Sequence, residues 1–311
     1  MNQKKILVTG ANGQIGSVLT QSLRSQFGTD LVITSDLSAP ENPNGPFEIL
    51  DITDHQMTAD LIQKHKITDV YHLAALLSAK GEANPMLTWR INLDAYLNIL
   101  ELAREKKIQK IFFPSTIAVF GATTPREETP QDVPLLPETV YGISKTSGEL
   151  LSNYYAKKFD VDVRSLRYPG IIGYQSLPGG GTTDYAVEIF YEALRHKTYS
   201  CFLEADTRLP MMYIFDAIRA TIELMEAPKQ NVKLKYGYNL AAMSFTPAEI
   251  AAEIQKHIPD FKISYAPDFR QAIAASWTES IDDAQARADW GWRHEFDLSS
   301  MVKDMLENIK I

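Results

Sequence analysis

The sequence is short of cysteine, of long apolar runs and of positive charge. Its only cysteine is Cys201, which excludes an intrachain disulfide and a cysteine metal cluster, and we expect no metal. No apolar stretch reaches the ~18 residues that a membrane-spanning helix needs. The net charge of −8 argues against nucleic acid or an anionic membrane as a partner. Because a strand-like run starts at Lys5, we expect no signal peptide and a cytoplasmic protein.

What the first half does contain is a regular alternation of strand-like and helix-like segments. Strands are expected at 5–9, 31–35, 47–50, 69–74, 110–115 and 163–167, and helices at 58–64, 86–106 and 141–159. Alternation of this kind predicts an α/β fold in which a doubly wound parallel sheet is covered by helices on both faces.

The rhythm changes after Pro169, where glycines and prolines become frequent. We expect loops and one helix at 183–194, then a helix at 212–225, a strand at 262–265 and a terminal helix from Asp297. The predicted plan is a cofactor-binding domain of residues 1–168 and about 211–240. Residues 169–210 and about 241–311 would form a smaller, mostly α-helical substrate lobe.

A glycine-rich loop connects the first predicted strand to a helical stretch at 17–23. Glycines allow the backbone to turn sharply and approach a pyrophosphate, and the helix N-terminus offers free N–H groups to the anion. The order of strand, glycine loop and helix therefore predicts a dinucleotide-binding site. The contacts expected from this loop are Gly10, Asn12, Gly13, Gln14, Ile15 and Gly16.

Asp36 ends the second predicted strand, 20 residues after the last glycine of the loop. A carboxylate there accepts hydrogen bonds from the adenosine ribose and repels a 2′-phosphate, so we expect NAD rather than NADP. Asp36 could instead cap a turn. Asp51 and Ile52 are expected near the adenine, and residues 73–75 (Leu73, Ala74 and Ala75) near the pyrophosphate and ribose.

Tyr141 and Lys145 are four residues apart on a predicted helix and therefore share one face. A nearby ammonium stabilises tyrosinate, which makes Tyr141 a candidate general base toward an alcohol. Tyr154 and Lys158 have the same spacing. Tyr141 is favoured because it begins the helix, at the carboxyl edge of the sheet where ligands bind in such folds.

Ser115 and Thr116 follow the fifth predicted strand at the same edge. A hydroxyl in this position could hydrogen-bond the reacting oxygen and stabilise alkoxide charge. Alternatively, both side chains could only satisfy backbone groups in a turn.

Taken together, these motifs resemble the extended short-chain dehydrogenase/reductase superfamily. They are 10–16, Asp36, 114–121, 141–145 and 167–170, with Phe120 in place of a more usual tyrosine. The resemblance implies that Thr116 rather than Ser115 supplies the catalytic hydroxyl and that Lys145 holds the nicotinamide ribose. It also implies that Asn92 holds a helix and a proton-relay water, and we expect Tyr168 to contact the cofactor.

Residues 72–82, 178–187, 276–283 and 289–292 are similar to one branch of that superfamily, the short-chain L-threonine 3-dehydrogenases. The similarity implies NAD-dependent oxidation of the L-threonine 3-hydroxyl to 2-amino-3-oxobutyrate, with Tyr141 as general base and Thr116 positioning the oxygen.

A zwitterionic amino acid needs hydrogen-bond donors for its carboxylate and an acceptor for its ammonium. Ser78, Thr182 and Thr183 are candidate donors, Asp184 is a candidate acceptor, and Trp277 could wall the pocket. Thr182 or Thr183 could instead cap the following helix, and Trp277 could belong to the core.

Two other functions remain open at this point. A nucleotide-sugar epimerase or dehydratase of the same superfamily would need basic clamps for a diphosphate, and residues 169–210 offer few cations. A non-enzymatic NAD-binding protein would not need Thr116, Tyr141 and Lys145 together. The superfamily resemblance further implies a homodimer, in which helices 86–106 and 141–159 of each subunit form a four-helix bundle.

Overall fold

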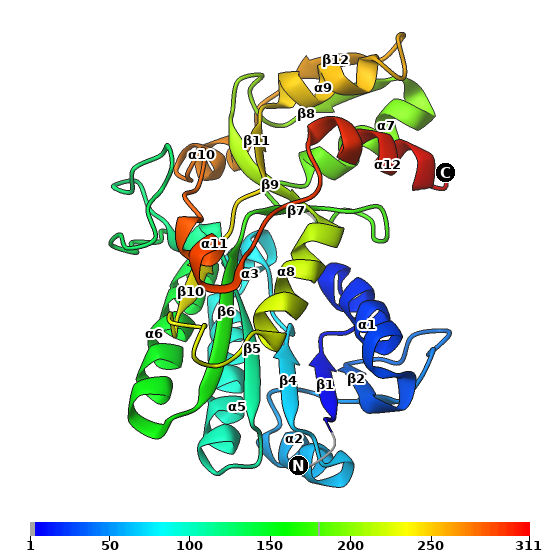
Figure 1. Ribbon diagram of the computed structural model, residues 1–311. Coiled ribbons are helices and arrows are strands. Elements are labelled where there is room, and N and C mark those ends of the chain that lie inside the picture. Colours follow the sequence, from blue (N-terminus) through cyan, green and yellow to red (C-terminus); the bar gives the residue numbers. More distant parts are fainter. Residues whose placement is uncertain (1–3, 180) are drawn as a thin grey trace.

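A seven-stranded, entirely parallel sheet organises the larger lobe of the computed structural model, which describes residues 4–179 and 181–311 (Figure 1). The strand order is β10-β6-β5-β4-β1-β2-β3. The bounds are β1 Ile6–Thr9, β2 Val32–Asp36, β3 Phe47–Ile49, β4 Asp69–His72, β5 Lys110–Thr116, β6 Asp162–Tyr168 and β10 Gly237–Asn239. All six strands predicted in the first half of the chain are present, and the doubly wound prediction is confirmed.

Helices cover both faces of this sheet, as the apolar periodicity predicts. On one face α2 (His55–His65), α5 (Ala95–Arg104) and α6 (Val140–Phe159) pack around a core that contains Leu61, Ile99 and Tyr155. On the other face lie α1 (Gln14–Phe27) and α8 (Ile214–Glu226), with Leu19 and Leu224 fully buried. The sheet is therefore inaccessible along its length and meets ligands only at its ends.

The long helix expected at 86–106 is continuous but not uniform. It consists of α4 (Pro85–Trp89), a π-helical turn at Arg90–Asp94 and α5. A π-helical turn inserts one extra residue per turn and often marks a functional position. Here the turn contains Asn92, which is 1% exposed.

The smaller lobe lies beyond the carboxyl ends of the strands, at the top of Figure 1. It contains two small sheets of order β11-β9-β7 and β12-β8, so it is less helical than the sequence suggests. The strands are β7 Gly170–Ile172, β8 Thr198–Cys201, β9 Leu209–Tyr213, β11 Met243–Phe245 and β12 Lys262–Tyr265. The helices are α7 Tyr185–His196, α9 Pro247–Gln255, α10 Phe269–Ala275, α11 Ala284–Trp290 and α12 Leu298–Asn308, and a short α3 (Ser78–Ala83) follows β4.

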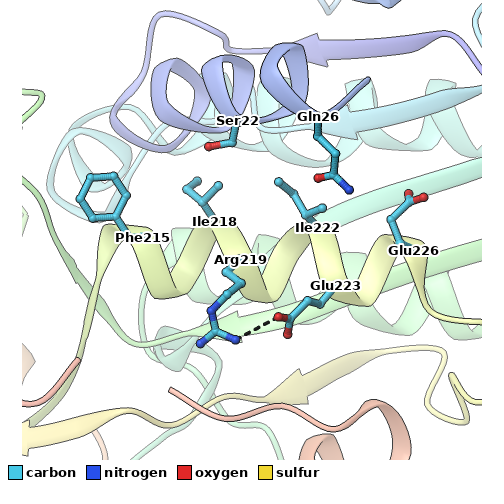
Figure 2. A pocket seen from close by; sticks show the side chains of 8 residues that line it. All are labelled: Ser22, Gln26, Phe215, Ile218, Arg219, Ile222, Glu223 and Glu226. Atoms are coloured by element: carbon cyan, nitrogen blue, oxygen red, sulfur yellow. Dashed lines mark hydrogen bonds and ion pairs between the residues drawn. The ribbon is translucent and has the colours of Figure 1, made fainter. Parts of the chain in front are cut away.

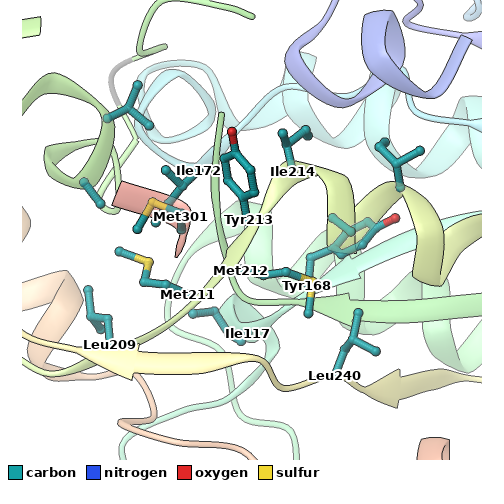
Figure 3. Close-up of a cluster of buried hydrophobic side chains, with 14 of the residues drawn as sticks. Ile117, Tyr168, Ile172, Leu209, Met211, Met212, Tyr213, Ile214, Leu240 and Met301 are labelled. Carbon is teal, nitrogen blue, oxygen red and sulfur yellow. The ribbon is translucent and has the colours of Figure 1, made fainter. Parts of the chain in front are cut away.

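Buried apolar side chains join the two lobes into one core (Figure 3). Tyr168 ends β6 of the large sheet, Met211 lies in β9, and Met301 belongs to the terminal helix α12. Met211 and Met301 are fully buried. Because burial of one such side chain contributes roughly 1.5–3 kcal/mol, this shared cluster fixes how the small lobe sits over the sheet edge.

Candidate active site

The predicted functional residues meet in a cleft of about 260 Å³ between the two lobes, at the carboxyl ends of β1, β4, β5 and β6. The predicted residues that line it are Gly10, Gly13, Gln14, Ile15, Gly16, Leu73, Ala75, Ser78, Thr116, Tyr141, Lys145, Tyr168, Thr182, Thr183, Asp184 and Trp277. Those outside its lining are Asn12, Asp36, Asp51, Ile52, Ala74 and Asn92. The sequence prediction missed lining residues at 77, 114, 117, 169–171 and 181. Of these, Pro169-Gly170 had a signal in the sequence, because the regular alternation of strands and helices ends there.

The glycine loop is shaped as a pyrophosphate site requires. Gly10 has a left-handed φ of 68°, and a Cβ there would lie 2.7 Å from the backbone nitrogen of Ala74. A Cβ at Gly16 would lie 2.2 Å from the Gly10 carbonyl oxygen. Gly13 caps α1 without a side-chain hydrogen bond, so the first N–H groups of the helix are left for a ligand.

Asp36 ends β2 beside the glycine loop. Its carboxylate accepts hydrogen bonds from the backbone N–H of Asn12 (2.9 Å) and of Leu37 (2.8 Å), so the turn-forming role is real. A carboxylate has about four lone-pair sites, which leaves acceptor capacity for ribose hydroxyls. Asp51 is bound by Thr53, which lowers the pKa of the Asp51 carboxyl, and the neighbouring Ile52 is 6% exposed.

The start of α6 holds Tyr141 against β5. Thr139 caps the helix by accepting a hydrogen bond from Gly142, and a Cβ at Gly142 would lie 2.2 Å from the carbonyl oxygen of Ala118. This close approach brings Tyr141 into hydrogen-bonding contact with the Thr116 side chain. Burial raises the pKa of Tyr141 to about 12, and the bond to Thr116 acts in the opposite direction.

Lys145 lies one helical turn further along α6 and is 4% exposed. Its Nζ is 5.8 Å from the centre of the Tyr141 ring and donates a hydrogen bond to the carbonyl oxygen of Pro114 at 2.9 Å. Burial lowers the pKa of Lys145 to about 7. An ammonium so close to the phenol favours tyrosinate, which is the form that can accept a proton from an alcohol.

Polar groups from the small lobe and from α3 face the same cleft. Ser78 begins α3 and is 7% exposed, and Thr182 is 2% exposed. Asp184 is the N-cap residue of α7, a place that the sequence left open for Thr182 or Thr183, and its Oδ2 accepts the Gly181 N–H at 2.8 Å. Trp277, 7% exposed, supplies an apolar wall. The cleft thus offers hydroxyls, a carboxylate and an aromatic face to one small ligand.

Residues 6–241 match the model of the NAD-dependent epimerase/dehydratase family. The chain belongs to this family.

Similar proteins cover nearly all of this epimerase/dehydratase-family chain. The mitochondrial L-threonine 3-dehydrogenase of Bos taurus is 47% identical over 98% of the chain and 82% of its own length. The holo form of a GalE-like L-threonine dehydrogenase from Cupriavidus necator is 52% identical, covers 98% of this chain and 100% of its own, and has a TM-score of 0.97. A monomeric L-threonine 3-dehydrogenase from a metagenome is 49% identical, covers 98% of both chains and has a TM-score of 0.95.

NAD is the cofactor of this epimerase/dehydratase family, and the glycine loop and Asp36 fit it.

Two predicted contacts are positioned differently from the rest. The Tyr168 ring lines the cleft, but its hydroxyl is bound to Thr221 of α8. Asn92 lies outside the lining: its side chain bonds both backbone groups of Leu76 and donates to Ser144 Oγ at 3.2 Å. Asn92 therefore ties the segment that follows β4 to the catalytic helix.

A second hollow, of about 360 Å³, lies between α1 and α8 (Figure 2). Ile218 and Ile222 point from α8 toward α1, whereas Arg219, which bonds Glu223, points away from α1. None of its lining residues belongs to the predicted site, so the chemistry is assigned to the cleft at the sheet edge.

Within 4–179 and 181–311 no helix is long and apolar enough to cross a membrane, and the side chains described there include no three-ligand metal cluster.

Proposed function

We propose that the protein oxidises the 3-hydroxyl of L-threonine to 2-amino-3-oxobutyrate with NAD as hydride acceptor. The observation that carries this proposal is similarity along the whole chain, at 47–52% identity, to proteins named L-threonine dehydrogenase. The small cleft with its hydroxyls, carboxylate and apolar wall supports an amino acid rather than a nucleotide sugar as substrate. An oxidoreductase of threonine catabolism is therefore the function that fits best.

Thr116, Tyr141 and Lys145 would perform the proton chemistry. Tyr141 would accept the proton of the substrate hydroxyl, and Thr116, already bonded to Tyr141, would hold the same oxygen. Lys145 would stabilise the tyrosinate and hold the nicotinamide ribose. When bound, NAD supplies the electrophilic nicotinamide carbon that takes the hydride from the substrate carbon. All three side chains line the cleft.

The substrate zwitterion would be held from the opposite side of the cleft. Ser78, Thr182 and Thr183 would donate hydrogen bonds to the carboxylate, and Asp184 would bind the ammonium directly or through water. Trp277 would exclude water from the reacting carbon. At the cofactor end, Asp36 would bind the adenosine ribose, with Asp51 and Ile52 near the adenine.

The proposal is tested by following NADH formation with L-threonine and with a panel that includes UDP-hexoses. Tyr141→Phe should lose about 10²–10⁴-fold in kcat because it removes the general base, while NAD binding survives. Tyr154→Phe is the matched control: Tyr154 has the same spacing to Lys158, bonds it at 3.0 Å and is 48% exposed, so its activity should be unchanged. Turnover of UDP-hexoses without turnover of L-threonine would refute the proposal.

The wider organisation remains part of the proposal. We place the NAD-binding domain at 1–168 and about 211–240 and the substrate lobe at 169–210 and about 241–311, which is supported by β10 in the large sheet. We also propose a cytoplasmic homodimer. Its support is a row of exposed apolar side chains on α4, α5 and α6, at Leu87, Leu97, Ile143 and Leu150. A monomeric relative exists, so the dimer needs its own test.

Light scattering of the purified protein measures the mass directly. A dimeric wild type that becomes monomeric on Leu150→Glu, a residue 66% exposed on α6, would support the four-helix interface. A monomeric wild type would refute the dimer and leave the catalytic proposal intact.

A further inference from the structure

A buried ion pair lies on the face of α6 that carries Tyr141 and Lys145, one helical turn beyond Lys145. Glu149 and Arg167 have exposed fractions of 1% and 2%. The guanidinium contacts the carboxylate through two nitrogens, with Nε to Oε1 at 2.9 Å and Nη2 to Oε2 at 2.8 Å. A Cβ at Gly237 would lie 2.5 Å from Glu149 Oε1, so glycine there allows the pair to close. A pair this enclosed is a poor source of stability, because desolvation offsets its attraction.

Ser115 completes the pair by donating to Glu149 Oε1 at 2.5 Å. It also pairs with Arg167 in the register between β5 and β6. Ser115 therefore bonds the carboxylate of the pair, lies beside Arg167 on the neighbouring strand and is itself 2% exposed. Ser115 lines the cleft like Thr116, but its hydroxyl is bonded to Glu149.

Three successive residues of β5 engage one face of α6. Tyr141, Lys145 and Glu149 follow one another at intervals of four and so lie on the same side of the helix. Thr116 bonds Tyr141, the Pro114 carbonyl accepts from Lys145, and Ser115 donates to Glu149. The first two contacts belong to the proposed chemistry. The third is the only one of the three that contains a fixed charge pair, and it sets the helix against the strand.

The same network continues into the small lobe. Arg167 Nη1 donates to Asn239 Oδ1 at 3.0 Å, and Asn239 Nδ2 donates to the carbonyls of Thr129 (3.0 Å) and Asp282 (3.2 Å). The Thr129 hydroxyl is bonded to that of Thr278, which follows Trp277. Buried hydrogen bonds, passing through Thr129, therefore link Glu149 of α6 to Thr278, the neighbour of the residue that walls the cleft.

We propose that Glu149 and Arg167 are positioning residues that fix the register of α6 against β5, and with it the geometry of Tyr141, Lys145 and Thr116. The inference rests on the proposed function. Buried charges tolerate little displacement, because a lost hydrogen bond in a low-dielectric site is not replaced by water. A misplacement of about 1 Å from a reacting group can cost about 10²-fold in rate, so the pair would act on kcat rather than only on stability.

Glu149→Gln keeps the side-chain volume but leaves the Arg167 charge without its counter-ion. We expect kcat with L-threonine and NAD to fall about 10–100-fold and its pH profile to shift, with a smaller effect on the KM for NAD. Asp162→Asn is the matched control. Asp162 pairs with Arg164 at 3.0 Å on the same strand, and Arg164 is 2% exposed. Along β6, Asp162 lies roughly 16 Å and Arg164 roughly 10 Å from Arg167, so loss of that pair should lower the melting temperature and leave kcat within about twofold.

Ser115→Ala tests the same contact without burying an unpaired charge and covers the case in which Glu149→Gln does not fold. We expect about a tenfold lower kcat, and less than that when the change is added to Glu149→Gln, because both act through one contact. Wild-type kcat and pH profile in Ser115→Ala, or equal losses in Asp162→Asn and Glu149→Gln, would overturn the inference. A wild type that does not oxidise L-threonine would instead refute the proposed function, so the two failures are distinguishable.

Discussion

His72 should make the fold sensitive to mild acid. It ends β4, is 2% exposed, stacks on Tyr96 with ring centres 5.7 Å apart, and has its Nδ1 3.3 Å from Thr9 Oγ1. Its Nε2 has no hydrogen-bond partner among the described residues. Burial, with the Lys145 charge as a smaller contribution, lowers the pKa of His72 from 6.5 to about 3. The folded protein therefore holds this imidazole neutral at every pH above that value.

Whether acid stabilises or destabilises the fold depends on which state of the chain, folded or unfolded, binds a proton at His72. Below about pH 6.5 the unfolded chain protonates His72 and the folded chain does not, so the free energy of unfolding falls as the pH falls. For pKa values of 6.5 and about 3, the loss between about pH 8 and pH 5 is roughly 2 kcal/mol. It grows to roughly 4–5 kcal/mol near pH 3, below which it no longer changes.

Urea unfolding at about pH 8 and pH 5 measures this loss. His72→Asn can keep a bond to Thr9 but cannot take a proton, so its free energy of unfolding should fall about 2 kcal/mol less than that of the wild type. His196→Gln, at an exposed position on α7, should behave like the wild type. Equal pH dependence in His72→Asn and the wild type would refute the reasoning, because other titrating groups are common to both.

Three further predictions concern the cleft. Asp36→Ala should raise the KM for NAD and reduce the preference for NAD over NADP, because the carboxylate that binds the ribose and repels a 2′-phosphate is gone. Steady-state kinetics with each cofactor measure both effects. Gly16→Ala should weaken NAD binding at least about tenfold in a calorimetric titration, since its Cβ would meet a backbone oxygen at 2.2 Å, whereas Gly179→Ala, with nothing within 4 Å, should not. Thr116→Ala should lower kcat roughly tenfold and move the pH profile of kcat to higher pH, because the bond from Thr116 lowers the pKa of Tyr141. A pH profile equal to that of the wild type would count against that bond.

The large lobe could be predicted from the sequence because its elements are set by local patterns. Except between β2 and β3, the six strands of the first half are separated by helices of clear apolar periodicity, and the glycine loop marks the ligand edge. The residues expected around that edge follow because parallel strands end together. Sixteen of the predicted residues do line one cleft.

The small lobe was harder because its signals are short and depend on distant partners. β9 is a fully buried run that passes directly into α8 at Ile214, and such an apolar run cannot be told from helix by periodicity. The Glu149–Arg167 pair could not be read from spacing, since its geometry depends on Gly237 and on the register that sets Arg167 beside Ser115, 52 residues earlier in the chain. The π-helical turn around Asn92 likewise requires tertiary contacts that a single sequence does not display.

The shared core of Figure 3 has a consequence for how the molecule opens. Because Tyr168, Met211 and Met301 pack in one cluster, α12 cannot detach without uncovering the end of the large sheet. The two lobes should then melt as one cooperative unit. A cofactor bound at the edge of the large sheet would therefore protect the far C-terminal helix from proteolysis, by about 2.7 kcal/mol at a concentration of 100 times its Kd. Cofactor occupancy would thereby slow proteolysis of the whole chain, including parts that never contact the cofactor.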